Sequence, residues 1–97
     1  MRVATTLLVE DNAETRAWLH DCVVAAFPDA RVVLAEDVAS GLTAIEAADF
    51  TLAIVDLGLP DGSGVELITA LRGSATYIVV ATIYDDDKSL FTALKSG

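Results

Sequence analysis

The fold is decided by residues 52–64, which read LAIVDLGLPDGSG. Apolar residues fill positions 52–55, a pattern typical of a strand that is buried on both faces. Asp56 ends this run, and the three glycines and one proline of the next eight residues predict a turn-rich loop. Binding sites of open α/β sheets form at the carboxyl ends of the strands. We therefore expect Asp56 to lie in a functional site, as a nucleophile, a metal ligand or both.

The composition indicates one small domain over residues 1–97. Of its residues, 54% are hydrophobic and only 6% are aromatic, so the core must be mainly aliphatic, which suits a sheet covered by helices. The formal net charge of −9 argues against direct binding to nucleic acid or to an anionic membrane. One cysteine, Cys22, cannot form an internal disulfide, and no apolar run approaches the ~18 residues of a membrane span. We therefore expect a cytoplasmic protein.

Strands and helices alternate along the chain. The predicted strands are residues 5–9, 31–35, 52–56 and 77–82, and the predicted helices lie between residues 12 and 28, at 40–48, at 65–71 and from 85 to about 95. Four βα units in a row predict a parallel sheet with helices on both faces. In the first helix, Trp18 and Cys22 lie in one four-residue row and Leu19 and Val23 in another. We expect Trp18 and Cys22 to pack in the core and His20 to be exposed.

Polar side chains follow three of these strands. Glu10 and Asp11 follow the first strand, Asp56 the third, and Thr82 ends the fourth. Parallel strands bring these residues to one edge of the sheet, where two like charges ~4 Å apart repel by ~1–4 kcal/mol. Oxygen ligands of this kind suit Mg²⁺, which would also neutralise an incoming phosphoryl group. A carboxylate can attack phosphorus to form an aspartyl phosphate, and the Thr82 hydroxyl could donate to a phosphoryl oxygen.

Each of these residues alone has a plainer explanation. Acids such as Glu10 and Asp11 often cap helices, and Thr82 could simply be a β-branched strand residue. Asp56 is more informative, because the residues before it are too apolar for a solvated edge. The convergence of all four supports a site.

Four motifs resemble the receiver domain of bacterial two-component response regulators. They read LLVEDN, VDLGLPDGSG, VVAT and ALKSG, and their order and spacing match that family over essentially the whole chain. The resemblance implies a flavodoxin-like, doubly wound parallel sheet, here in the order 2-1-3-4 and C-terminally incomplete. It also implies Mg²⁺-dependent transfer of phosphate from a histidine kinase to Asp56. Glu10 and Asp11 match the acid pair, the metal ligands are Asp11, Asp56 and the Gly58 carbonyl, and Thr82 is the switch residue.

The chain departs from the family pattern in two places. The fifth strand, its lysine and the fifth helix would follow Gly97, and Lys95 in the preceding predicted helix does not match that lysine. The position after Thr82 is usually small but is Ile83 here, which could narrow access to Asp56. A bare edge on the fourth strand would favour a homodimer, unless the chain is a fragment of a longer protein.

Three functions remain in competition. The first is a phosphoacceptor signalling module, which is not a turnover enzyme and which controls an output domain or partner. The DLGLPDGSG wording resembles regulators with a C-terminal DNA-binding domain. The second is an interaction domain of the same fold that works without phosphorylation. The third is an aspartyl-phosphate hydrolase of the haloacid dehalogenase type, which the glycine at position 58 opposes because those enzymes have a second Asp there.

Overall fold

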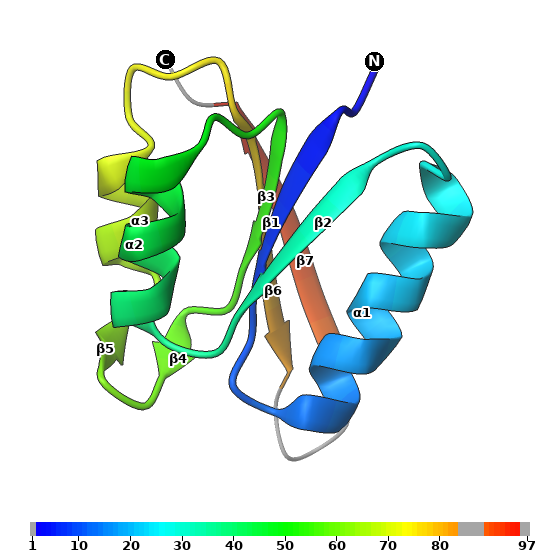
Figure 1. The fold of residues 1–97 in the computed structure, drawn as a ribbon. Helices are drawn as coiled ribbons and strands as arrows, with labels where there is room; N and C mark the ends of the chain where they lie inside the picture. The colour runs from blue at the N-terminus through cyan, green and yellow to red at the C-terminus, as the bar shows by residue number, and fades with distance from the viewer. Residues whose placement is uncertain (1, 84–88, 96–97) are drawn as a thin grey trace.

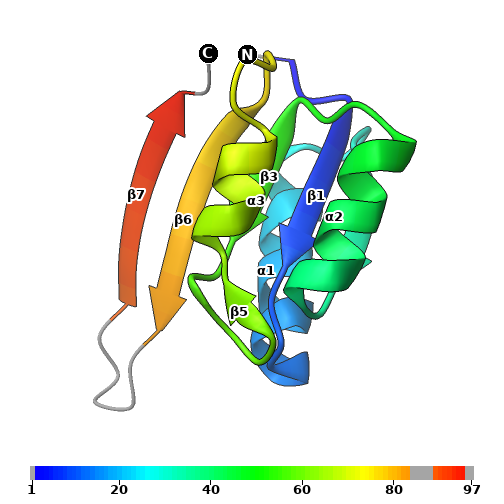
Figure 2. The same ribbon diagram turned by 90° about the vertical axis from the view of Figure 1, so that its left-hand side faces the viewer.

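A computed structural model describes residues 2–83 and 89–95 as a sheet with helices on both faces (Figures 1 and 2). The elements are β1 (Thr5–Val9), α1 (Ala13–Ala26), β2 (Arg31–Ala35), α2 (Val38–Ala47), β3 (Leu52–Val55), β4 (Gly58–Leu59), β5 (Gly62–Ser63), α3 (Val65–Ala70), β6 (Tyr77–Ile83) and β7 (Ser89–Lys95). The main sheet has the order β2-β1-β3-β6-β7, and its first four strands are parallel. The predicted flavodoxin-like order of the four parallel strands is therefore confirmed.

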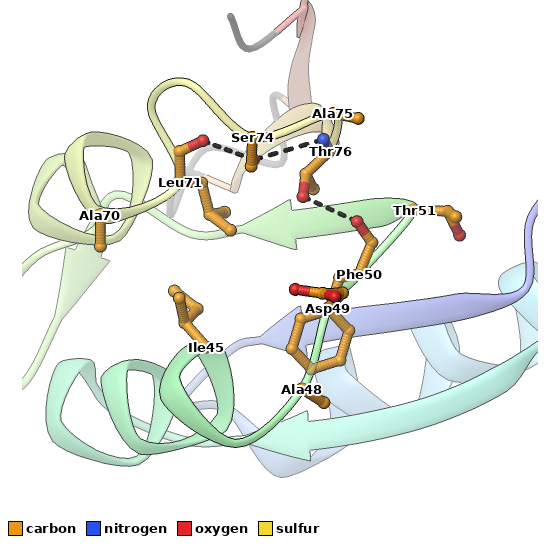
Figure 3. Close-up of a pocket in the computed structure, with 10 residues that line it drawn as sticks. All are labelled: Ile45, Ala48, Asp49, Phe50, Thr51, Ala70, Leu71, Ser74, Ala75 and Thr76. Carbon is orange, nitrogen blue, oxygen red and sulfur yellow. Dashed lines mark hydrogen bonds between the residues drawn. The ribbon is translucent and has the colours of Figure 1, made fainter.

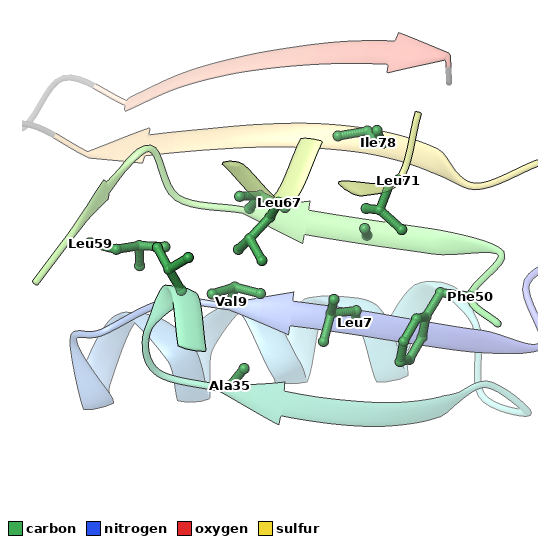
Figure 4. Close-up of a cluster of buried hydrophobic side chains, with 11 residues drawn as sticks. Leu7, Val9, Ala35, Phe50, Leu59, Leu67, Leu71 and Ile78 are labelled. Carbon is green, nitrogen blue, oxygen red and sulfur yellow. The ribbon is translucent and has the colours of Figure 1, made fainter. Parts of the chain in front are cut away.

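The buried side chains form one cluster on each face of the sheet. The cluster beneath α2 and α3 consists of Leu7, Val9, Ala35, Val38, Phe50, Ala53, Val55, Leu59, Leu67, Leu71 and Ile78 (Figure 4). The cluster beneath α1 consists of Val3, Leu8, Leu19, Val23, Leu52, Ile54 and Ala81. All four residues of β3 are buried, as expected for a strand covered on both faces. Asp56 therefore leaves the sheet at the centre of the fold.

Helix α1 buries a different row of side chains from the one expected. Leu19 and Val23 face the sheet and are buried, whereas Trp18 is 53% exposed and Cys22 is exposed. The prediction that Trp18 and Cys22 belong to the core is wrong. A helix packed on one side buries one stripe, and the four-residue spacing of two adjacent rows cannot show which row that is.

Within the described residues, no helix is both long and apolar enough to cross a membrane.

Residues 89–95 form a strand, so the predicted fourth helix is wrong. Strand β7 runs antiparallel to β6 along its full length, from Tyr77 opposite Lys95 to Ile83 opposite Ser89 (Figure 2). A short apolar segment fits a helix or a strand by periodicity alone, and the unpaired backbone groups at the edge of β6 favour the strand. The expected helix start at residues 85–87 lies outside the described residues.

The new strand changes two expectations. The edge of β6 is paired within the chain, so the predicted bare edge is wrong and no longer gives a reason to expect a homodimer. Lys95 is paired with Tyr77 at the amino end of β6, the opposite end of the sheet from Asp56. Its backbone position therefore does not place it with the acidic residues.

Candidate functional site

Two acids lie in the turn between β1 and α1. The Glu10 amide donates to the Ala35 carbonyl oxygen (3.0 Å), which continues the β1–β2 ladder and holds Glu10 at the end of the sheet. The Glu10 side chain is only 5% exposed, whereas Asp11 is exposed. The Asp11 amide donates to Glu10 Oε2 (3.1 Å), and Asn12 caps α1 by accepting from the Thr15 amide (2.9 Å). Asn12 thus caps the helix, so neither Glu10 nor Asp11 serves as its cap.

Asp56 meets these acids from the adjacent strand. Its amide donates to the Val9 carbonyl oxygen (3.0 Å), so the ends of β1 and β3 are joined directly before the two acidic turns. The side chain is half-buried, and its Oδ1 accepts from the Gly58 amide (3.0 Å). This bond turns the carboxylate toward the loop that follows β3 and fixes its orientation.

Glu10, Asp11 and Asp56 form one acidic cluster. Each offers a carboxylate oxygen, and the three oxygens lie within 4.8 Å of one another. Burial, hydrogen bonding with the Asp56 side chain, and the negative charges of Asp56 and Asp11 raise the pKa of Glu10 from 4.5 to about 8. Without a cation the cluster therefore holds a proton on Glu10 at neutral pH. A set of oxygen ligands at this spacing fits a hard divalent cation such as Mg²⁺.

Arg16 braces the acidic turn. Its Nη1 donates to the Glu10 carbonyl oxygen at 2.9 Å and to the Asp11 carbonyl oxygen at 3.5 Å. The guanidinium thus binds the backbone of the acidic pair from the first turn of α1. Arg16 could not be predicted from the sequence, because an arginine in a helix gives no signal of a contact with a backbone carbonyl.

Gly64 allows the loop to close beside Asp56. A Cβ atom at Gly64 would lie 2.2 Å from the Asp56 carbonyl oxygen and 2.7 Å from Val55 Cγ1. The Gly64 amide donates to the Leu57 carbonyl oxygen (3.1 Å), so the chain returns against its own path. The backbone torsion φ of Gly64 is an ordinary −57°, so the glycine is required for space and not for its conformation.

The two remaining predicted site residues are placed by the backbone. Gly58 begins β4, and a Cβ there would lie 4.0 Å from Asp56 Oδ1, so its main chain borders the carboxylate. Val80 pairs with Val55, so Thr82 lies two residues further along β6, at the edge where Asp56 leaves the sheet. The side chain of Thr82 is outside the part of the chain that the structure describes.

A cavity of about 540 Å³ lies at the other edge of the sheet (Figure 3). It opens between the carboxyl ends of α2 and α3, and its wall includes Ile45, Phe50 and Leu71. The buried Thr76 hydroxyl donates to the Phe50 carbonyl oxygen (2.7 Å) and ties the starts of β3 and β6 together. The cavity is therefore separate from the acidic cluster.

The chain is similar to known signalling proteins. Residues 6–97 match the family described as the response regulator receiver domain. The KDP operon transcriptional regulatory protein KdpE of Escherichia coli K12 is 33% identical over 96 residues, which are 98% of this chain and 42% of KdpE. The chain thus spans less than half of that relative.

Two solved structures have the same fold. A response regulator from Burkholderia pseudomallei with a phosphorylated aspartic acid, a calcium ion and citrate gives a TM-score of 0.74 at 26% identity, over 84% of this chain and 48% of that one. The response regulator TrrA of Thermotoga maritima in complex with Mg²⁺ and BeF gives 0.74 at 22% identity, over 86% and 72%. The fold and the acidic cluster at the carboxyl edge of the sheet agree with the match over residues 6–97. That match shows that the chain belongs to the response regulator receiver domain family.

Proposed function

We propose that this chain is a phosphoacceptor module in which Asp56 receives a phosphoryl group from a histidine kinase. One observation supports this proposal above the others: the carboxylates of Glu10, Asp11 and Asp56 meet at the carboxyl edge of the sheet. A nucleophile and two further acids in one place serve phosphoryl transfer better than they serve stability, because gathered carboxylates repel one another.

The reaction is a displacement at phosphorus. A carboxylate oxygen of Asp56 forms a bond to phosphorus while the bond from phosphorus to the phosphohistidine nitrogen breaks, and the imidazole leaves with that electron pair. The hydrogen bond from the Gly58 amide orients the attacking carboxylate. The product is an aspartyl phosphate, and no turnover of a free substrate is required.

The acidic cluster can hold the metal that this chemistry needs. Asp11, Asp56 and the Gly58 carbonyl would be ligands of Mg²⁺, with Glu10 beside them. When bound, Mg²⁺ neutralises the charge that develops on the phosphoryl oxygens. Glu10 holds a proton in the absence of metal, because its pKa is about 8. Release of that proton would accompany metal binding at neutral pH.

Thr82 is the proposed switch. The register of β6 puts its backbone at the edge where Asp56 lies. A hydrogen bond donated from this position by the Thr82 hydroxyl to a phosphoryl oxygen would pull the end of β6 toward Asp56. The ladder between β6 and β7 would then move with it.

The output and the partners extend the same proposal. The similarity to a transcriptional regulatory protein supports an output in transcription. The resemblance of DLGLPDGSG to regulators with a C-terminal DNA-binding domain favours such a domain, in a longer chain, as the output. The solved relative with a phosphorylated aspartic acid supports phosphate on Asp56, and the relative with Mg²⁺ and BeF supports Mg²⁺ as the cofactor. We place the module in the cytoplasm, where a kinase and reduced Cys22 would be found.

Acetyl phosphate tests the proposal without a kinase. The chain is incubated with acetyl phosphate and MgCl₂, and its intact mass is recorded. We expect the parent to gain the mass of one phosphoryl group and Asp56→Asn to gain none. Asp11→Asn should need more Mg²⁺ than the parent to reach the same labelling. Asp49→Asn is the matched control, because it removes the same charge from an exposed carboxylate at the opposite edge of the sheet.

The controls separate the competing functions. Labelling of Asp56→Asn at the parent's rate would contradict the proposal. A parent that binds Mg²⁺ but gains no mass would favour the interaction domain that works without phosphorylation. Steady release of inorganic phosphate from excess acetyl phosphate would favour the hydrolase.

A further inference from the structure

The loop after Asp56 folds into a small hairpin whose tip reaches another helix. Strands β4 and β5 pair in antiparallel fashion, with Gly58 opposite Ser63 and Leu59 opposite Gly62. Pro60 and Asp61 form the two-residue turn between them. This hairpin lies below α2 and α3 in Figure 1. Its base borders Asp56 and its tip is the most distant part of the loop.

Asp61 attaches this tip to the start of α2. Its Oδ1 accepts from the Val38 amide (2.8 Å) and its Oδ2 from the Ala39 amide (3.0 Å). These residues lie 23 and 22 positions earlier in the chain. Amides at a helix N-terminus have no partner within the helix and are stabilised by a negative charge. Both oxygens of one carboxylate thus bind the first two amides of α2.

Helix α2 already has a cap of its own. The Asp37 side chain accepts from the Ser40 amide (2.8 Å), and the Ser40 hydroxyl oxygen accepts in turn from the Asp37 amide. These two bonds make a capping box. Asp37 therefore satisfies the start of the helix locally, while Asp61 satisfies the two amides that Asp37 does not reach. The two caps contact the same helix turn, but only Asp61 belongs to the loop of the acidic site.

The base of the hairpin contacts Asp56 of the acidic cluster. At its base, the Gly58 amide donates to Asp56 Oδ1 (3.0 Å), and the Gly64 amide donates to the Leu57 carbonyl oxygen (3.1 Å). Gly64 also packs against the Asp56 carbonyl oxygen too closely for any side chain. Through these contacts, a shift of the tip would act on the Gly58 backbone and the Asp56 carboxylate.

We propose that Asp61 is a positioning residue of the site, which fixes the Gly58 main chain and the Asp56 carboxylate by anchoring the β4–β5 hairpin to α2. The proposal rests on the proposed function for its effect on Mg²⁺ and on phosphorylation. Because binding coupling is reciprocal, Mg²⁺ at the acidic cluster also stabilises the contact between Asp61 and α2. The start of α2 then responds to the state of the site.

The test compares the two caps. Asp61→Ala and Asp37→Ala each remove one negative charge and one cap from the same helix turn, but only Asp61→Ala releases the hairpin. MgCl₂ is titrated into each ¹⁵N-labelled variant while the Gly58 and Gly64 amide resonances are followed. We expect Asp61→Ala to weaken Mg²⁺ binding by about tenfold, the lower end of the loss seen when a direct partner of a metal ligand is removed, because Asp61 acts on the ligands only through the hairpin. We expect Asp37→Ala to bind within about twofold of the parent and Asp61→Asn, which keeps one acceptor oxygen, to fall between them.

Acetyl-phosphate labelling at limiting Mg²⁺ should follow the same order. Parent-like Mg²⁺ binding in Asp61→Ala would overturn the proposal, and so would an equal loss in Asp37→Ala, which would make Asp61 only a helix cap. Amide hydrogen exchange of the metal-free proteins gives a second measure. Exchange at Gly58 should be faster in Asp61→Ala and unchanged in Asp37→Ala.

These measurements separate the two proposals. A parent that neither binds Mg²⁺ nor is labelled contradicts the proposed function alone. In that case hydrogen exchange at Gly58 still decides whether Asp61 positions the loop. Unchanged exchange in Asp61→Ala would overturn the positioning role.

Discussion

Gly64→Ala should damage stability and the acidic site together. The new methyl carbon would lie 2.2 Å from the Asp56 carbonyl oxygen and 2.7 Å from Val55 Cγ1, whereas real Cβ contacts under 3.0 Å are essentially never found. The nearest atom belongs to the backbone and cannot rotate away, so β3 or the start of α3 has to move. Overpacking typically costs 1–3 kcal/mol, and we expect about 3 kcal/mol here. For a domain of this size that lowers the melting temperature by roughly 12–24 °C.

Gly73→Ala is the matched control. Gly73 has a φ of +85° and no atom within 4 Å of its Cβ position, so alanine meets strain in the left-handed region but no clash. That strain costs about 1–2 kcal/mol. Urea unfolding followed by circular dichroism gives both free energies of unfolding, and Mg²⁺ titration gives both affinities. Only Gly64→Ala should lose Mg²⁺ affinity. A Gly64→Ala variant within about 0.5 kcal/mol of the parent, with unchanged Mg²⁺ binding, would refute the reasoning.

Three further predictions concern charge, packing and lifetime. The pKa of Glu10 is higher in the folded chain than its ordinary 4.5, so its contribution to stability is present below pH 4.5 and is lost as the pH rises to about 8. In EDTA, the free energy of unfolding of the parent relative to Glu10→Gln should therefore fall over this range, and a flat difference would contradict the shift. The buried Thr6 hydroxyl has no hydrogen-bond partner among the described residues, so Thr6→Val should stabilise the chain by about 1 kcal/mol in urea unfolding, and a loss of stability would show an overlooked partner. Phosphate on Asp56 should be lost slowly, because Gly58 has no side chain to orient water. Gly58→Asn should therefore shorten the half-life of the aspartyl phosphate more than Gly58→Ala does. Equal half-lives in the parent and both variants would contradict this role of position 58.

The positions of the acidic residues could be predicted from the sequence. Buried parallel strands leave little freedom for the residues at their carboxyl ends, because the ladder fixes where each strand stops. The amides of Glu10 and Asp56 continue that ladder by one bond each, so their backbones leave the sheet at the same edge. Local pattern and tertiary contact agree at these positions, so the three carboxylates lie together as expected, while their roles stay predictions.

The contacts of the loop could not be predicted. Asp61 and Gly64 look like ordinary turn residues in LPDGSG, and nothing in the sequence shows that one binds a helix 22 residues away or that the other touches a carbonyl oxygen. A turn motif predicts a local conformation, whereas these roles depend on which distant backbone lies beside the turn.

The errors in the core and at residues 89–95 have a similar origin. Periodicity placed Trp18 and Leu19 on two equally spaced rows of one helix, and only the sheet beneath α1 selects the Leu19 row. The sequence predicts a helix at residues 89–95 because acids precede the segment and Leu90, Phe91 and Leu94 share one helical face. The pairing of β7 with β6 is a contact between strands, which local periodicity does not encode.

The most direct test of the account locates the phosphoryl group in the chain. The parent is labelled with acetyl phosphate and MgCl₂, reduced with borohydride and digested, and the peptides are sequenced by mass spectrometry. Reduction of an acyl phosphate converts its aspartate to homoserine. We expect homoserine at Asp56 alone, and none when EDTA replaces MgCl₂. Homoserine at another acid, or labelling at Asp56 that does not depend on Mg²⁺, would contradict it.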